Sequence, residues 1–68
     1  MEKKIIMAVM KGNHTVADIG DHLGITFHLA VHQLSIKIDG MVDKGMLSER
    51  NGQIDINKTW MKRNLSNG

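Results

Sequence analysis

Apolar residues recur at helical spacing over most of the chain. The first such stripe consists of Ile5, Ile6, Val9 and Met10. Because residues three and four apart share one face of a helix, this spacing predicts a first helix from about Glu2 to Lys11. We expect the helix to stop at Gly12, since glycine readily adopts the left-handed conformation that follows helix C-termini.

A second, shorter helix is predicted between Thr15 and Gly24. Thr15 and Asp18 are spaced much like a capping box, in which side chains satisfy the open backbone groups of the first turn. The buried side of this helix is expected to consist of Val16, Ile19, Gly20 and Leu23. Gly24 then ends it.

The longest apolar pattern predicts a third helix that stops at Gly45, with Thr26 as its N-cap. Its buried face is expected to consist of Phe27, Ala30, Val31, Leu34, Ile38, Met41 and Val42. Leu29 and Ile36 point away from this face if the helix is continuous. Two explanations are open: the helix begins later and leaves Leu29 in a buried turn, or both residues face a partner such as a second copy of the chain.

After Gly45 the pattern indicates two short strands, 46–50 and 53–57, separated only by Asn51 and Gly52. Asn-Gly is typical of the type I′ turn of a hairpin, because both central residues need positive φ. A two-residue loop sets a register in which Arg50 faces Gln53, Ser48 faces Asp55 and Leu47 faces Ile56. Leu47, Ile54 and Ile56 would then share the inner face of the hairpin.

The predicted fold class is α+β and mostly helical: three helices followed by a two-stranded hairpin, in one domain of residues 1–63. The segment 58–61 closes this domain, with Trp60 over an edge of the core, and residues 64–68 form a flexible tail. A chain of 68 residues has room for one small core, and without cysteine it has no disulfide scaffold. Because no long apolar run is present, we expect a cytoplasmic protein without a membrane partner.

Three stretches resemble the winged helix-turn-helix family, the compact DNA-binding domain of many prokaryotic regulators. They are the helix and turn of 15–26, the end of the third helix at 41–47, and the hairpin around Asn51 and Gly52, which would be the wing. The resemblance covers about residues 3–57. The stretch from Gly24 to Gly45 is one helical turn longer than usual in the family, so the third helix or the turn before it is extended. Gln33 also stands where the family places an apolar residue.

The resemblance implies that the third helix enters the major groove of DNA while the wing contacts the backbone or minor groove. The DNA-binding residues would be Thr26, His28, His32, Gln33, Ser35, Lys37, Arg50 and Asn51. Gln33 can pair bidentately with adenine, Lys37 can neutralise a phosphate, and Arg50 suits a phosphate or a narrow minor groove. Alternatively, these are solvated positions on an amphipathic helix, beside a hairpin that only covers the core.

We therefore expect sequence-specific binding of double-stranded DNA by a small transcriptional regulator, for example a repressor, which could form a homodimer. The alternative is a winged-helix protein–protein interaction module that uses Leu29 and Ile36 or the wing. The net charge of +2 gives only weak support to a polyanionic partner.

The sequence does not predict an enzyme, because it has no nucleophile and base at a recognisable spacing and no glycine-rich phosphate loop. His28 and His32 lie four residues apart and could hold a metal together with His22 or Asp21. Base, phosphate or solvent contact is the stronger interpretation of these histidines. We therefore expect no metal, no cofactor and no small-molecule ligand.

Overall fold

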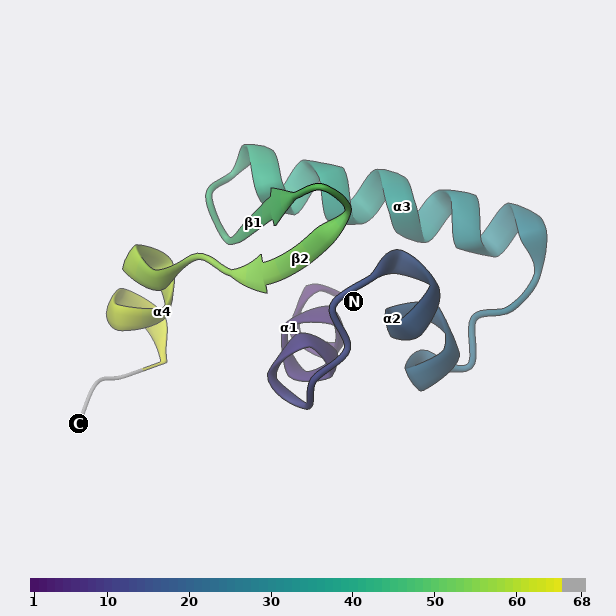
Figure 1. Ribbon diagram of the computed structural model, residues 1–68, viewed down its shortest axis with the longest axis horizontal. Coiled ribbons are helices and arrows are strands. Elements are labelled where there is room, and N and C mark those ends of the chain that lie inside the picture. Colours follow the sequence, from purple (N-terminus) through teal and green to yellow (C-terminus); the bar gives the residue numbers. More distant parts are fainter. Residues whose placement is uncertain (66–68) are drawn as a thin grey trace.

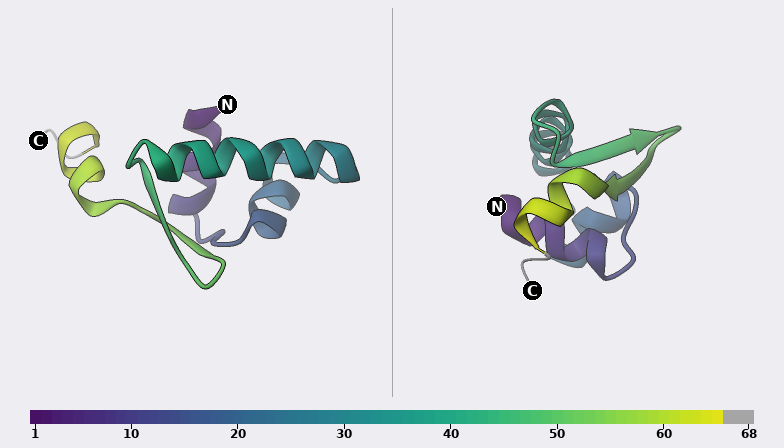
Figure 2. Two further views of the ribbon diagram at one scale, coloured as in Figure 1. Left: turned by 90° about the horizontal axis from the view of Figure 1, so that it is seen from above. Right: turned by 90° about the vertical axis from the view of Figure 1, so that its left-hand side faces the viewer.

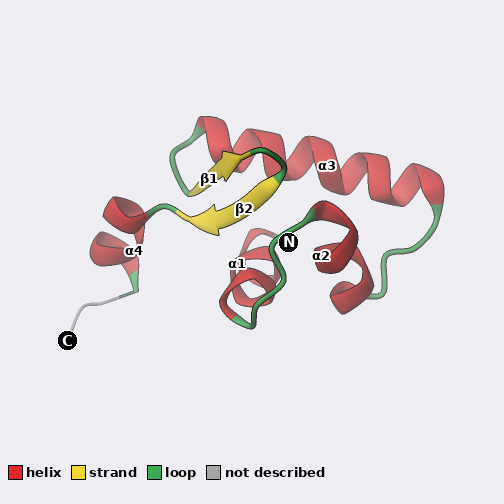
Figure 3. Cartoon of the chain, in the orientation of Figure 1, coloured by secondary structure: helices red, strands yellow, loops and turns green. Residues whose placement is uncertain are grey.

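The computed structural model describes residues 1–65, which form four helices and one hairpin. The elements in chain order are α1 (Glu2–Met10), α2 (Val16–Leu23), α3 (His28–Asp43), β1 (Leu47–Arg50), β2 (Gln53–Ile56) and α4 (Lys58–Asn64). In Figure 1, α3 runs along one edge of the molecule, with the hairpin, α1 and α2 beneath it. Colouring by secondary structure shows that helices dominate and that α4 stands apart from the other three helices (Figure 3).

The core lies where α1, α2, α3 and the hairpin meet. It consists of Ile5, Ile6, Ala8, Val9, Ile19, Leu34, Ile38, Met41, Leu47 and Ile54. The three predicted helices are confirmed, but Met10 was wrongly placed in the buried stripe, since it is 60% exposed. A helix turns by about 100° per residue, so Met10 follows Val9 out of the core, and Ala8 is buried instead.

The predicted ends of α2 are confirmed. The Thr15 hydroxyl accepts a hydrogen bond from the backbone N–H of Asp18 at 3.1 Å, and Gly24 ends the helix with a φ of 75°. In the following turn, the N–H of Ile25 donates to the carbonyl of Gly20 at 2.7 Å. Gly20 is buried at this close approach, which a Cβ would obstruct.

The start of α3 differs from the prediction. Its N-cap is Phe27, not Thr26, and no side chain caps the first turn. Phe27 was expected in the core but is 82% exposed, because it precedes the helix in an extended conformation and so does not follow the helical spacing of the buried face. Leu29, in contrast, lies inside the helix and is 77% exposed, so the explanation that placed it in a buried turn is wrong. The extra turn of chain lengthens α3, which has 16 residues.

The hairpin has the predicted register: Leu47 pairs with Ile56, Ser48 with Asp55, Glu49 with Ile54 and Arg50 with Gln53. Its turn residues Asn51 and Gly52 have φ values of 54° and 81°, as the Asn-Gly signal requires. Leu47 and Ile54 are fully buried, while Ile56 is half-buried at the edge of the core. Figure 2 shows the hairpin projecting sideways from beneath α3.

A fourth helix, which the sequence analysis did not predict, follows the hairpin. The side chain of Asn57 caps α4 by accepting a hydrogen bond from the N–H of Trp60 at 3.1 Å. Trp60 is half-buried and packs against the core, as expected, but α4 has no fully buried residue. The helix includes Asn64, the first residue of the predicted tail, and residues 66–68 of that tail lie outside the described residues.

Candidate nucleic-acid interface

The N-terminal half of α3 presents polar side chains to solvent. The exposed residues proposed for DNA contact here are Thr26, His28, His32 and Gln33. In Figure 1 this end of α3 extends beyond α2, so the first turns of the helix are open on their outer side. A rod of this kind can enter the major groove, which is wide enough for an α-helix.

The tip of the hairpin provides a second exposed group of residues beside α3. Arg50 and Asn51 are both exposed there, and β1 packs against α3. In the end-on view of Figure 2, the tip rises to the level of α3 and lies to one side of it. Within residues 1–65 Arg50 forms no ion pair, and Asp55 instead lies 3.2 Å from Nδ1 of His14. The guanidinium is therefore available to an anion.

Lys37 does not belong to this open surface. Its Nζ lies 3.2 Å from Oε2 of Glu2, and Nζ of Lys44 lies at the same distance from the same oxygen. Hydrogen bonds and charge from Lys44 and Lys37 lower the pKa of Glu2 below its usual value. The Lys37 side chain is 42% exposed and faces α1, so half of its charge environment is set by Glu2. Ser35 is also only half-exposed.

The outer face of α3 changes character along its length. Its first half carries His28 and His32, whereas its second half carries the exposed acids Asp39 and Asp43. No lysine or arginine lies between them on this face, because Lys37 is turned toward Glu2. The electrostatics therefore favour a polyanion only at the N-terminal half of the helix.

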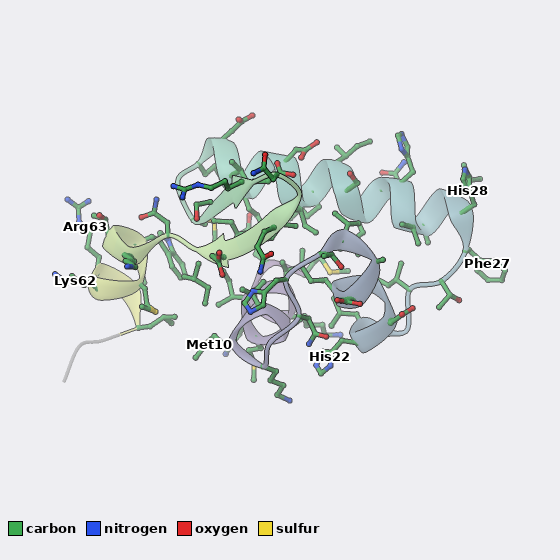
Figure 4. The ribbon with its side chains drawn as sticks, in the orientation of Figure 1. Met10, His22, Phe27, His28, Lys62 and Arg63 are labelled. Atoms are coloured by element: carbon green, nitrogen blue, oxygen red, sulfur yellow. The ribbon has the colours of Figure 1, made fainter. Side chains whose placement is uncertain are left out.

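The basic residues of α4 lie far from this half of α3. In Figure 4, Lys62 and Arg63 point outward at one end of the molecule, and Phe27 and His28 lie at the other end. The positive charges of the two chain ends therefore do not gather around the start of α3. This distribution weakens the case for DNA binding that the net charge suggested.

The histidines do not converge. Figure 4 places His22, on α2, well away from His28, so His22 cannot complete a site with the first turns of α3. Among residues 1–65, no group of three or more histidine, aspartate or glutamate side chains is arranged to hold a metal ion. The ring Nδ1 of His14 lies 2.8 Å from the carbonyl oxygen of Ile54, which gives this histidine a structural contact instead.

The ion-pair cluster at Glu2 is the feature that sequence reasoning missed. Lys44 lies 42 residues from Glu2 in the chain, so no local spacing could have indicated the contact. The only available signal was that Lys37 and Lys44 share one helix face, seven residues apart.

Comparison with protein-family models, curated proteins and solved structures found no match to this chain. Within residues 1–65, none of the helices combines the length and the apolar character needed to span a membrane. The functional inferences below depend on the arrangement of this chain's own side chains.

Proposed function

We propose that this protein binds double-stranded DNA, with the N-terminal half of α3 in the major groove and the hairpin as a wing. The observation that carries the proposal is that the exposed polar start of α3 lies beside an exposed hairpin tip with an unpaired Arg50 (Figure 2). The helix order, the α2–α3 turn and the hairpin agree with the winged helix-turn-helix resemblance. In that family the first residues of the recognition helix contact base edges.

The side chains at the start of α3 have chemistry suited to bases and phosphates. Gln33 can donate to and accept from adenine in the major groove, and His28 and His32 can hydrogen-bond to bases or phosphates. The positive end of the α3 dipole favours a nearby phosphate. Exposed Phe27 and Leu29 can contact thymine methyl groups, which favours AT-containing sites.

The acids of α3 set the orientation. Asp39 and Asp43 are exposed and repel phosphates, so the C-terminal half of the helix must point away from the DNA backbone. The wing then contacts backbone or minor groove through Arg50 and Asn51, where the narrow groove attracts arginine. Occupation of an operator in this way would make the protein a small transcriptional regulator, for example a repressor.

The experiment is a fluorescence-anisotropy titration of a random-sequence duplex at several salt concentrations. We expect affinity to fall steeply with salt, and Arg50→Ala to reduce the salt slope by about one unit, because one phosphate contact is lost. Lys62→Ala, on α4, is the matched control and should leave the slope unchanged. If the wild-type chain fails to bind at low salt, or if only the control loses affinity, the proposal is wrong.

Base reading requires a second experiment, selection of preferred sites from a randomised duplex pool. Gln33→Ala should weaken binding to the selected site by about 1–3 kcal/mol and relax the preference at one position. Its binding to random duplex should be nearly unchanged. Equal losses on selected and random duplexes would show that Gln33 does not read a base.

A protein-interaction module is the second candidate function. It is favoured by the exposure of Leu29 and Ile36, which are 77% and 52% exposed on a helix face without a partner. A module of this kind would show little affinity for random duplex at any salt concentration, so the anisotropy titration separates the two functions.

A further inference from the structure

The solvent face of α3 has two parallel stripes of different character. At about 100° per residue, one stripe holds four ionisable residues: His28, His32, Asp39 and Asp43. The neighbouring stripe holds Leu29, Ile36 and Gly40. In Figure 1 this face forms the upper edge of the molecule, with no other element above it.

The charges of the first stripe suit a partner helix better than α3 itself. A helix favours acids near its N-terminus and cations near its C-terminus. In α3 the first turn has no acid and the last turn has no basic residue, while Asp39 and Asp43 stand near the negative end of the dipole. An antiparallel helix laid on this face would reverse the relation, because its positive end would lie beside these acids.

Gly40 supports close packing on the second stripe. A glycine in the middle of a helix costs about 1 kcal/mol relative to alanine. Nothing in the described chain requires it, since a Cβ at Gly40 would meet no atom within 4 Å. Gly20, in contrast, is required by a neighbouring carbonyl. The absent side chain at position 40 leaves a hollow on the same stripe as the exposed Leu29 and Ile36.

We propose that a second copy of this chain packs antiparallel on α3, about a two-fold axis that passes between residues 35 and 36. That axis brings His28 opposite Asp43 and His32 opposite Asp39 of the second copy. It also sets the two Ile36 side chains against each other and places Leu29 near the hollow at the other copy's Gly40. Both stripes are self-complementary about one axis, as a two-fold interface requires.

This pairing has a regulatory consequence that rests on the proposed function. The paired face includes His32 and the flank of Gln33, so a protein paired in this way cannot lay the start of α3 in the major groove. Self-association and DNA binding exclude each other. Because α3 is only about 24 Å long, the interface is small and the pairing is concentration dependent.

The experiment measures oligomeric state by sedimentation equilibrium of the full chain without DNA. Wild type should dimerise reversibly. Gly40→Gln fills the hollow and should weaken the dimer by roughly tenfold, or about 1.4 kcal/mol, while helix propensity keeps the monomer at least as stable. A wild-type chain that stays monomeric up to about 1 mM would overturn the proposal, as would a Gly40→Gln chain that dimerises equally well.

A charge exchange tests the register. H32E alone should weaken the dimer through repulsion from Asp39 of the other copy, and D39K alone removes the histidine's partner. The double variant H32E/D39K should recover wild-type dimerisation, because each exchanged pair is again of opposite charge. Both positions are exposed, and circular dichroism checks that the fold is retained. A double variant weaker than either single variant would show that the two residues do not face each other.

Duplex binding distinguishes failure of this inference from failure of the proposed function. If both hold, Gly40→Gln should bind random duplex more tightly than wild type at protein concentrations where wild type is dimeric. If the dimer forms but no variant binds duplex, the pairing is correct and the DNA-binding proposal is wrong. If wild type binds duplex and remains monomeric throughout, the pairing is wrong and the proposed function stands.

Discussion

His14 and Ile54 are joined by two hydrogen bonds that attach the hairpin to the helices. The N–H of Ile54 donates to the carbonyl of His14 at 2.7 Å, and Nδ1 of His14 lies 2.8 Å from the carbonyl oxygen of Ile54. Since a carbonyl oxygen only accepts, Nδ1 must carry the hydrogen. The ring thus provides the second bond that a neighbouring strand would otherwise donate from its backbone. It connects the α1–α2 loop to β2 and fixes the position of the proposed wing.

His14→Ala should therefore loosen the hairpin as well as destabilise the fold. We expect a loss of about 0.5–1.5 kcal/mol, the usual net value of one hydrogen bond, measured by urea denaturation. Hydrogen exchange should accelerate at the amides of β1 and β2. His22→Ala, at an exposed position on α2, is the matched control and should leave both quantities unchanged. Unaltered hairpin exchange in His14→Ala would contradict this role.

The pairing of Glu2 with Lys44 and Lys37 predicts a pH-dependent contribution to stability. The lysines lower the pKa of Glu2 in the folded state. Its ionised form therefore stabilises the fold above the usual pKa of glutamate, and this contribution disappears as the pH falls through the lowered value. Glu2→Gln should be less stable than wild type at neutral pH and equally stable in strong acid. Denaturation at the two pH values, with and without added salt, tests this, and a pH-independent difference would contradict it.

Two glycines should respond in opposite ways to alanine. A Cβ at Gly20 would come within 2.8 Å of the carbonyl oxygen of Ile25, a backbone atom that cannot move without disturbing the α2–α3 turn. Gly20→Ala should cost about 1–3 kcal/mol. Gly40→Ala meets open space in an α-helix and should stabilise the monomer by up to about 1 kcal/mol. Thermal denaturation at a concentration where the chain is monomeric measures both, and equal effects would contradict the assignment.

The sequence was sufficient for features that local chemistry determines. The hairpin register followed from Asn51 and Gly52, because two successive residues with positive φ permit only a tight turn of one type. Thr15 and Gly24 marked the ends of α2 for the same kind of local reason, a hydroxyl cap and a left-handed glycine. These signals act within a few residues and do not depend on the rest of the fold.

Features that depend on tertiary geometry were missed. Phe27 has the spacing of a core residue, but the turn after α2 keeps the chain extended until His28, so the aromatic ring lies in solvent. The N-cap role of Asn57 was readable from its position three residues before Trp60, but Asn57 was assigned to the end of a strand. The contact from Glu2 to Lys37 joins two helices that only the fold brings together.

The proposed DNA surface combines both kinds of information. Arg50 and Gln33 were predicted from sequence as contact residues, and both are exposed. Lys37 was predicted as a phosphate contact, and its position beside Glu2 leaves Arg50 as the exposed cation of the surface. We therefore expect Arg50 to carry more of the salt dependence of binding than Lys37.

The most direct test of the DNA-binding proposal is NMR mapping of backbone amides during titration with a duplex, at a protein concentration where the chain is monomeric. We expect shifts or broadening at residues 26–33 and 50–52, and little change at residues 58–64 of α4. Perturbation confined to α4 and α1, or no perturbation at low salt, would show that α3 and the hairpin do not form a DNA-binding surface.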